Sequence, residues 1–152
     1  MSSIIPYLYF DGTCEAAMNF YHSVLGGNIP YVGRYSDMPP SAENDDCKND
    51  PADANRIMHM SLQMEDGSVI LASDVPSKEM PGFKFTAGNN IAMSINASSR
   101  EHADKVFNGL SAGGMVTMPM NDTFWGAYFG MWIDKFGISW MVNYDDPAKM
   151  QK

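Results

Sequence analysis

Apolar and polar residues alternate along several short stretches of this chain. Because successive side chains of a strand point to opposite faces, this alternation predicts β-strands. Apolar residues at helical spacing predict two helices, the first over residues 14–25 and the second ending at Gly113–Gly114. Strands are predicted at residues 4–10, 29–35, 56–64, 68–73, 90–96 and 115–120, followed by two aromatic strands joined by the turn Asp134–Lys–Phe–Gly137.

Local signals mark the ends of both helices. Asp11–Gly–Thr13 supplies a turn and a side-chain cap before the first helix, and Ser98–Ser–Arg–Glu101 is a capping-box pattern before the second. A Gly–Gly pair follows each helix, as expected for a left-handed stop. The buried helix faces are predicted to carry Ala17, Tyr21, Val24 and Leu25 in the first helix and Ala103, Val106, Phe107 and Leu110 in the second.

The order of these elements repeats along the chain. Each half runs strand, helix and three further strands, and a shift of 87 positions lays Asp11 on Ser98 and Phe20 on Phe107. Agreement in element order is evidence for an internal repeat. The sequence therefore predicts an α+β fold of two βαβββ modules, at about residues 1–74 and 89–146, with a linker at 75–88.

The two faces of the predicted strands differ in character. One face is apolar and is expected to pack under the helices, whereas the other carries Tyr, His, Ser, Gln and Asn but no Lys, Arg or Asp in five of the strands. Neutral polar groups with a few aromatics are typical of a concave surface that binds a small molecule. The alternative is a mildly polar interface between two sheets or two subunits.

Composition narrows the possible partners. The 152 residues match one domain, and the net charge of -8 disfavours nucleic acid as a partner. No apolar run approaches membrane-spanning length, and no signal peptide is recognisable at the N-terminus. We therefore expect a cytoplasmic protein in which Cys14 and Cys47 are reduced and have no catalytic or zinc role. The fourteen methionines are predicted either to fill irregular gaps or to line an adaptable pocket.

Several motifs resemble one known family. They are Pro6–Tyr–Leu–Tyr–Phe10, Asp122–Thr–Phe–Trp–Gly126, Asp134–Lys–Phe–Gly137 and Trp140–Met–Val–Asn143. In these the chain resembles the PhnB-like group of the vicinal oxygen chelate superfamily, which includes the glyoxalase and bleomycin-resistance proteins. The resemblance implies a glyoxalase-like fold, in which paired modules form a cup-shaped mixed sheet.

The resemblance also implies where a metal would sit. Metal-dependent members carry four His or Glu ligands, and the matching positions here fall near Ile5 or Pro6, at Leu71, at Asn90 and at Met141. These side chains are poor ligands for a divalent ion. We therefore expect no metal and no other cofactor. Some relatives carry a methyltransferase name, but no strand here is followed by a glycine-rich turn that opens a helix and would hold a methyl donor.

Candidate ligand-binding residues follow from the faces and the motifs. His59 is also a weak candidate for a catalytic base, for which Tyr7, Tyr9, Ser61 or Ser73 would be the partner, and a buried structural His is the alternative. Trp140 is assigned to the core. The aromatic residues favour a planar or cationic ligand. The predicted ligand-binding residues are Tyr7, Tyr9, His59, Ser61, Ser73, Trp125, Tyr128, Trp132 and Asn143.

These observations support one leading function and two alternatives. The leading one is metal-independent binding of a small aromatic or cationic molecule by a homodimer in the cytoplasm. The first alternative is a lyase, isomerase or dioxygenase with a non-standard metal site. The second is a structural or partner-binding role through the acidic segment 36–55, which is predicted to be a long loop.

Overall fold

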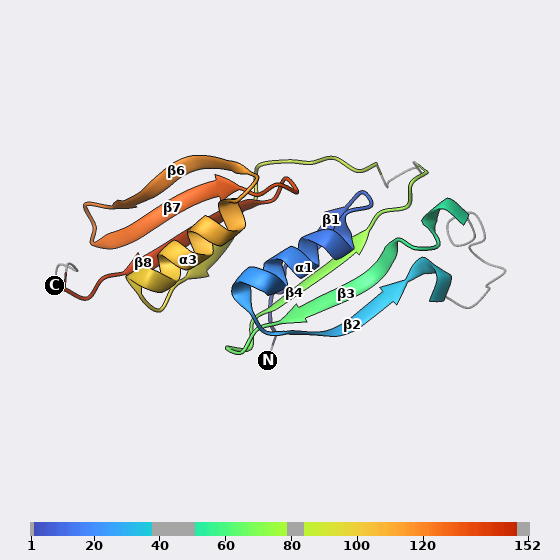
Figure 1. Cartoon of the computed structure of the whole chain (residues 1–152), viewed down its shortest axis with the longest axis horizontal. Coiled ribbons are helices and arrows are strands. Elements are labelled where there is room, and N and C mark those ends of the chain that lie inside the picture. The colour runs from blue at the N-terminus through green and yellow to red at the C-terminus, as the bar shows by residue number, and fades with distance from the viewer. Residues whose placement is uncertain (1, 38–50, 79–83, 149–152) are drawn as a thin grey trace. The chain divides into compact units, whose positions relative to one another are not determined.

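The computed structural model describes residues 2–37, 51–78 and 84–148 of the chain, shown in Figure 1. It divides into two compact units, Met1–Thr86 and Ala87–Lys152. Each unit has its own sheet and its own helix, and the boundary lies within residues 75–88.

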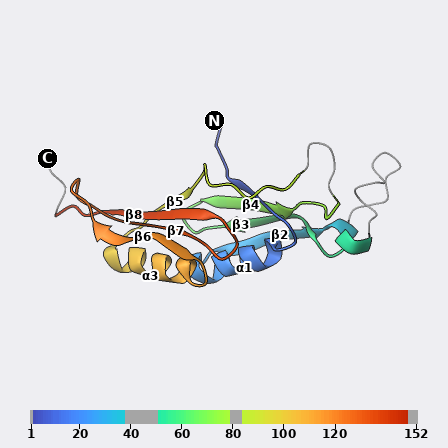
Figure 2. The ribbon, with the colours of Figure 1, turned by 90° about the horizontal axis from the view of Figure 1, so that it is seen from above.

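The first unit is a four-stranded mixed sheet with one helix. It comprises β1 (Tyr7–Phe10), α1 (Cys14–Leu25), β2 (Asn28–Arg34), the short 3-10 helices η1 (Tyr35–Asp37) and η2 (Pro51–Asp53), β3 (Ile57–Gln63) and β4 (Val69–Asp74). The strand order is β1-β4-β3-β2, with β1 parallel to β4 and the other pairs antiparallel. Helix α1 lies along one side of this sheet, as Figure 2 shows.

The second unit repeats this arrangement. It comprises β5 (Met93–Asn96), α3 (Arg100–Ser111), β6 (Met115–Asp122), β7 (Ala127–Ile133) and β8 (Ser139–Asp145). The order β5-β8-β7-β6 has the same pattern, with β5 parallel to β8. The predicted α+β fold of two βαβββ modules is confirmed, and it contains two separate four-stranded sheets.

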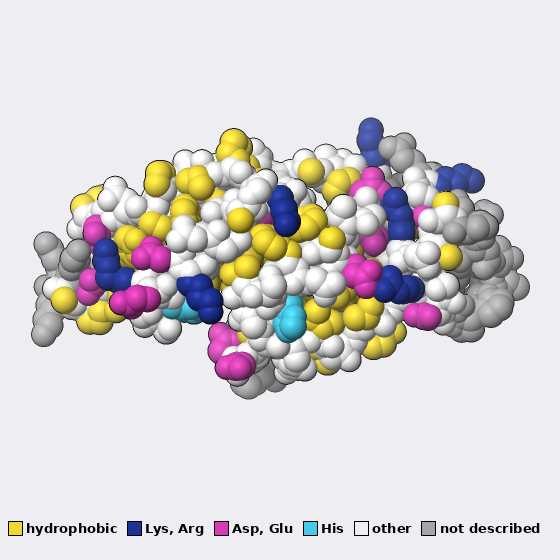
Figure 3. Space-filling model, in the orientation of Figure 1, with side chains coloured by type: hydrophobic (Ala, Val, Ile, Leu, Met, Phe, Trp, Pro, Cys, Tyr) yellow, Lys and Arg dark blue, Asp and Glu magenta, His cyan; other side chains and the backbone are white. Residues whose placement is uncertain are grey.

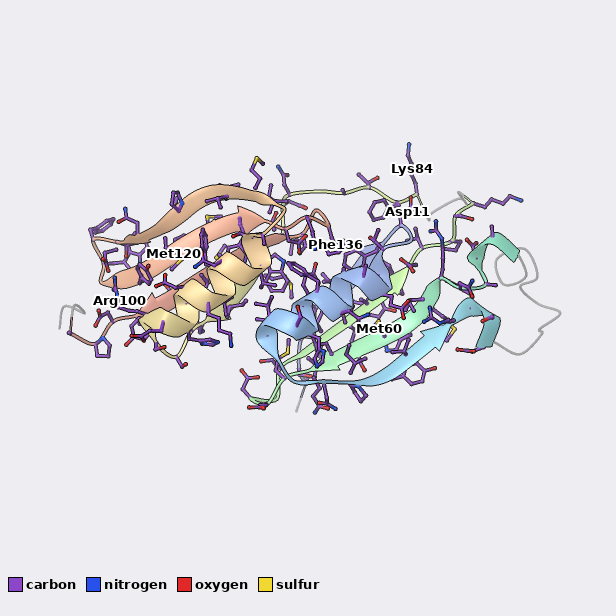
Figure 4. All side chains as sticks on the ribbon, in the orientation of Figure 1. Asp11, Met60, Lys84, Arg100, Met120 and Phe136 are labelled. Atoms are coloured by element: carbon purple, nitrogen blue, oxygen red, sulfur yellow. The ribbon has the colours of Figure 1, made fainter. Side chains whose placement is uncertain are left out.

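The core of the first unit lies between α1 and the helix-facing side of its sheet. Met60 of β3, labelled in Figure 4, is buried together with Leu62 and Ala72. Complete burial of a side chain the size of Met60 or Leu62 stabilises a fold by about 1.5–3 kcal/mol. The predicted helix face was partly wrong, because Val24 and Leu25 are only half-buried. The buried residues of α1 are Cys14, Ala17, Met18 and Tyr21.

The core of the second unit is built around two stacked tryptophans. The rings of Trp132 and Trp140 are 6.3 Å apart and nearly parallel, at 3°. Phe107 of α3 meets Trp132 edge-on, at 5.4 Å and 84°. The predicted face of the second helix is confirmed, since Ala103, Val106, Phe107 and Leu110 are all buried. Core placement of Trp140 is confirmed as well.

Two strands begin three residues later than predicted. β1 begins at Tyr7 instead of residue 4, and β5 begins at Met93 instead of residue 90. β1 begins where Tyr7 pairs with Leu71 of β4, and β5 begins where Met93 pairs with Trp140 of β8. Side-chain alternation continues on the N-terminal side of these residues, but the parallel pairing does not.

The N-terminal caps of the helices also differ from the prediction. Thr13 makes no side-chain hydrogen bond at the start of α1. Instead Asp74 of β4 accepts the backbone N–H groups of Gly12 and Cys14 through Oδ1, at 2.9 and 3.0 Å. The second helix is capped one residue later than expected, by Ser99, which accepts the N–H of His102 at 3.0 Å. A distant carboxylate therefore replaces the local cap of α1.

The predicted loop at residues 36–55 falls largely outside the described residues, which stop at Asp37 and resume at Pro51. Asp53 at its end is buried and accepts the N–H of Ser77. The Nε atom of Arg56 lies 3.4 Å from the same carboxylate.

Candidate functional site

The turn between β6 and β7 presents two large aromatic side chains. Thr123 holds the turn, because its backbone N–H and its hydroxyl both donate to the carbonyl oxygen of Ala127, at 2.7 and 2.9 Å. Gly126 closes it with a φ of 96°, a value that favours glycine. Phe124 and Trp125 lie between them and meet edge to face, with their centroids 5.0 Å apart. Both side chains are exposed.

An ion pair anchors the base of this turn to α3. Arg100, labelled in Figure 4, donates to both carboxylate oxygens of Asp122, at 2.8 and 3.2 Å. Its guanidinium also lies 4.0 Å from the centre of the Tyr128 ring. The hydrogen bond and charge of Asp122 raise the pKa of Arg100 above its usual value. Tyr128 in turn donates to Asp104 at 2.6 Å, and this hydrogen bond raises the pKa of Tyr128.

Beside this hairpin lies an open hollow of ≈ 480 Å³. That volume is within the range of small-molecule sites. Its lining is mainly apolar, with amide, hydroxyl and carboxylate groups among the aromatic rings and thioethers. The lining residues are Met118, Pro119, Met120, Asn121, Asp122, Thr123, Phe124, Trp125 and Phe129.

The register of the second sheet shows which residues share its open face, the face away from α3. Partners in register lie on the same face of a sheet. Two cross-strand rows run over β5, β8, β7 and β6 on this face. One row is Ser94, Met141, Met131 and Met118, and the other is Asn96, Asn143, Phe129 and Asn121.

Two predicted ligand-binding residues, Tyr128 and Trp132, were expected on the open face, and that placement was wrong. Trp132 is 1% exposed and packs on Phe107, and Tyr128 bonds to Asp104 of α3. Both therefore face the helix. The tight turn after β7 makes Trp132 the cross-strand partner of Trp140. Because Trp140 was assigned to the core, this pairing was the signal in the sequence that could have placed Trp132 in the core as well. Trp125 is 53% exposed and borders the hollow, and Asn143 lies on the open face.

The open face of the first sheet carries a row of aromatic rings. The structure places Tyr7, Tyr9 and His59 there, and the Tyr7 hydroxyl lies 3.2 Å from Nδ1 of His59. Tyr31 of β2 joins them, with its ring centre 5.9 Å from that of His59. Tyr31 was not among the predicted ligand-binding residues, although it lies in a predicted strand. Ser61 pairs with Tyr31 and Ser73 with Tyr9, so both serines are on this face.

Charged side chains occur on the helix of each unit, and Asp145 lies on the open face of the second sheet, where the Asn143 amide donates to it at 3.0 Å. In the view of Figure 3, acidic and basic groups appear over both units. The other open-face residues named above are uncharged. These residues are therefore suited to uncharged contacts or to ring stacking.

Comparison with known proteins shows the family of the chain. Residues 2–143 match the family model described as 3-demethylubiquinone-9 3-methyltransferase. The chain belongs to this family. The match covers both βαβββ units, so neither unit is an addition foreign to the family.

Several proteins of known sequence or structure are similar to this chain over nearly their whole length. Protein YjdN of Escherichia coli K12 is 30% identical over 142 residues, which are 91% of this chain and 92% of that protein. The crystal structure of PA1353 from Pseudomonas aeruginosa has a TM-score of 0.78 at 34% identity, covering 95% of this chain and 98% of that one. A structure described as a putative 3-demethylubiquinone-9 3-methyltransferase, PhnB protein, from Bacillus cereus has a TM-score of 0.71 at 26% identity, covering 94% and 99%.

The fold extends beyond the family. A glyoxalase/bleomycin resistance protein/dioxygenase family enzyme from Burkholderia phytofirmans has a TM-score of 0.61 at 17% identity, with 95% of this chain and 100% of that chain covered. At this identity the similarity establishes the fold alone. The PhnB-like resemblance and the glyoxalase-like fold are both confirmed.

The chain does not provide the donors that a divalent metal would need at the superfamily position. Leu71 and Met141 lie on the open faces of β4 and β8, opposite Tyr7 and Met131 respectively. A hydrocarbon and a thioether do not bind hard divalent ions. Within residues 2–37, 51–78 and 84–148 no group of three or more His, Cys, Asp and Glu side chains could hold a metal. The residues present therefore do not fit the metal of the metal-dependent relatives.

The family's methyltransferase description has no structural counterpart in the described strand-to-helix turns. The turn from β1 into α1 contains one glycine, Gly12, and its N–H group donates to Asp74. The N-terminus of α1 is thus already occupied by a carboxylate of the protein.

In the described part of the chain, no helix is long and apolar enough to cross a membrane.

Proposed function

We propose that this family member binds a small aromatic molecule, without a metal, in the hollow beside the β6–β7 hairpin. The observation that carries the proposal is the pair of rings at the tip, Phe124 and Trp125, exposed beside a hollow of ≈ 480 Å³. Exposed large rings cost free energy in water, and a flat ligand would cover them. Phe129 supplies an aromatic wall, and the amide of Asn121 supplies a hydrogen-bonding group.

Tryptophan fluorescence suits this test because the three tryptophans differ in exposure. Trp132 and Trp140 are each 1% exposed, whereas Trp125 is 53% exposed. Saturable quenching by a ligand in the hollow should therefore come from Trp125. We expect it on titration with a panel of aromatic compounds that includes nitrobenzene and N-methylquinolinium. A panel that produces no saturable quenching would contradict the proposal.

A matched pair of variants separates a specific loss of binding in the hollow from a general loss of structure. Phe129→Ala removes one ring of the hollow while Trp125 remains as reporter, and we expect roughly tenfold weaker binding because one stacked ring contributes on the order of 1–2 kcal/mol. Phe136→Ala is the control, because this half-buried Phe lies in the β7–β8 turn (Figure 4) and does not line the hollow. Equal weakening in both variants would mean a general loss of structure.

The same titration tests metal independence. Protein treated with EDTA and dialysed should bind the quenching probe with unchanged affinity. If treatment abolished binding and a divalent ion restored it, the alternative of a lyase, isomerase or dioxygenase with a non-standard metal site would be favoured.

We further propose that the protein is a homodimer. In the single chain the apolar side chains of Ile4, Ile91, Met115 and Val116 are exposed. Exposed apolar groups in this number favour association with a second copy. Light scattering on the eluting protein should give about twice the chain mass of 16.8 kDa. A mass of one chain at all concentrations tested would refute the dimer.

A further inference from the structure

The rings on the open face of the first unit form a continuous row. Tyr9 and Tyr7 lie 5.1 Å apart between centroids, Tyr7 and His59 5.7 Å, and His59 and Tyr31 5.9 Å. Neighbouring rings are tilted by only 33–43°. All three tyrosines are at least 38% exposed. We call Tyr7, Tyr9, His59 and Tyr31 the aromatic shelf.

Gly33 determines whether Tyr31 can join this shelf. Gly33 is the register partner of His59, so a side chain at this position would lie beside the imidazole on the same face. A Cβ placed there would fall 2.6 Å from the Tyr31 hydroxyl and 2.9 Å from its Cε1 atom. The Tyr31 ring therefore occupies the space that any other residue at position 33 would fill.

The electrostatic surroundings of the shelf favour a cation. A cation over a tyrosine face is attracted by the negative face of the ring. The two arginines of this unit that could compete for the rings are engaged elsewhere, Arg34 with Glu15 of α1 and Arg56 with Asp11. The chain carries a net charge of -8, which raises the local concentration of cations.

The shape of the shelf favours a flat ligand. Rings with centroids 5–6 Å apart overlap partly face against face, so a further flat ring can continue the row, whereas a compact ammonium ion is best held where rings surround a point. A fused aromatic cation can stack on an end ring of the row, since Tyr9 and Tyr31 are 56% and 49% exposed.

We propose that the aromatic shelf is a second binding site, separate from the hollow of the other unit, which takes a planar aromatic cation, and that Gly33 positions Tyr31 for it. The proposal does not depend on the hollow, since it rests on residues of β1, β2 and β3 alone. Tyr7, Tyr9 and Tyr31 contribute ring faces. The hydrogen bond between Tyr7 and His59 holds the middle of the row.

The test uses the full chain with ¹³C-labelled tyrosine rings and N-methylquinolinium as the probe, followed by NMR. We expect saturable shifts of the Tyr7, Tyr9 and Tyr31 signals, and none at Tyr21, which is buried. Quinoline, the neutral analogue, should bind more weakly by about fivefold or more, because it lacks the cation–π attraction. Equal affinity for both compounds, or no saturable shift at the shelf, would overturn the proposal.

Variants test the residues individually. Tyr31→Leu should weaken binding of the probe about fivefold through loss of one ring face. Gly33→Ala should weaken it similarly although Tyr31 is still present, and it should shift the Tyr31 signal before any probe is added. The added methyl meets the far end of a side chain rather than backbone, so we expect the fold to persist, as a circular dichroism spectrum would verify. Wild-type affinity in Gly33→Ala would refute the positioning role.

Two controls separate this site from the hollow. Gly88→Ala is the matched glycine control, because a Cβ there makes only an ordinary contact, 3.6 Å from the Asn90 side chain. Trp125→Phe should leave the tyrosine shifts intact while removing the quenching signal of the hollow. Probe binding that is lost in Trp125→Phe and retained in Tyr31→Leu would assign the cation to the hollow and overturn the proposal.

Discussion

Replacing Asp74 with alanine is expected to destabilise the protein by about 4 kcal/mol, a large part of the 5–15 kcal/mol typical of a domain. The Asp74 side chain is buried and accepts three backbone N–H groups, from Gly12, Cys14 and Ile57, at 2.9–3.0 Å. In Asp74→Ala all three donors would lose their acceptor, and the N–H groups of Cys14 and Ile57 would be left buried without a partner, at a cost of about 1–3 kcal/mol each. The negative charge near the N-terminus of α1 would also be lost.

Urea denaturation of Asp74→Ala and of a control measures this effect. Asp66→Ala is the matched control, because Asp66 lies in the exposed β3–β4 turn and accepts one backbone N–H, from Ser68, at 2.9 Å. We expect the control to lose less than about 1 kcal/mol. A similar small loss in Asp74→Ala would show that the carboxylate is not the cap of α1.

Cys14 is expected to react with N-ethylmaleimide at pH 8 about a thousandfold more slowly in the folded protein than in denatured protein. Burial, followed by the charges of Asp74 and Glu15, raises the pKa of the thiol from 9.0 to about 12. A rise of the pKa by one lowers the thiolate fraction tenfold, and the thiolate is the reactive form. The side chain is also inaccessible to solvent, which acts in the same direction.

A Cys47→Ser background leaves one thiol for this measurement. The labelled fraction of Cys14 is followed by mass spectrometry in native buffer and in guanidinium chloride. Equal rates in the two conditions would contradict both the burial and the raised pKa.

The same shift predicts a pH dependence of stability. The pKa of Cys14 is higher in the folded state than in the unfolded state. The contribution of this thiol to the free energy of unfolding is therefore complete below about pH 9 and is lost as the pH rises through about 12. The free energy of unfolding should therefore fall less steeply above pH 9 in Cys14→Ala than in the parent protein.

Local patterns in the sequence accounted for the elements and their order. The predicted first helix, residues 14–25, matches α1 residue for residue, because the Gly–Gly pair stops the helix locally, with positive φ at both glycines. The buried face of α3 was predicted because helical spacing alone aligns those four residues. The repeated order of strands and helices followed from the same short-range periodicity.

Long-range contacts decided what the patterns could not. The cap of α1 comes from Asp74, which is 60 positions from Cys14 along the chain, so no local signal pointed to it. The alternation in β7 showed that Tyr128 and Trp132 share a face, but only pairing with β8 and packing against α3 determined that this face is covered. The placement of Tyr31 beside His59 likewise depends on a register between strands.

By itself, the sequence determined the two βαβββ units, their helix faces and the family motif around Asp122–Thr–Phe–Trp–Gly126, because each depends on neighbours within a few residues. Only the tertiary structure decided which of the aromatic residues are core and which are accessible. Trp132 and Trp140 are buried while Trp125, in the same aromatic stretch, borders a hollow. The physical reason is that periodicity sorts side chains between two faces, whereas strand pairing and helix packing decide which face water reaches.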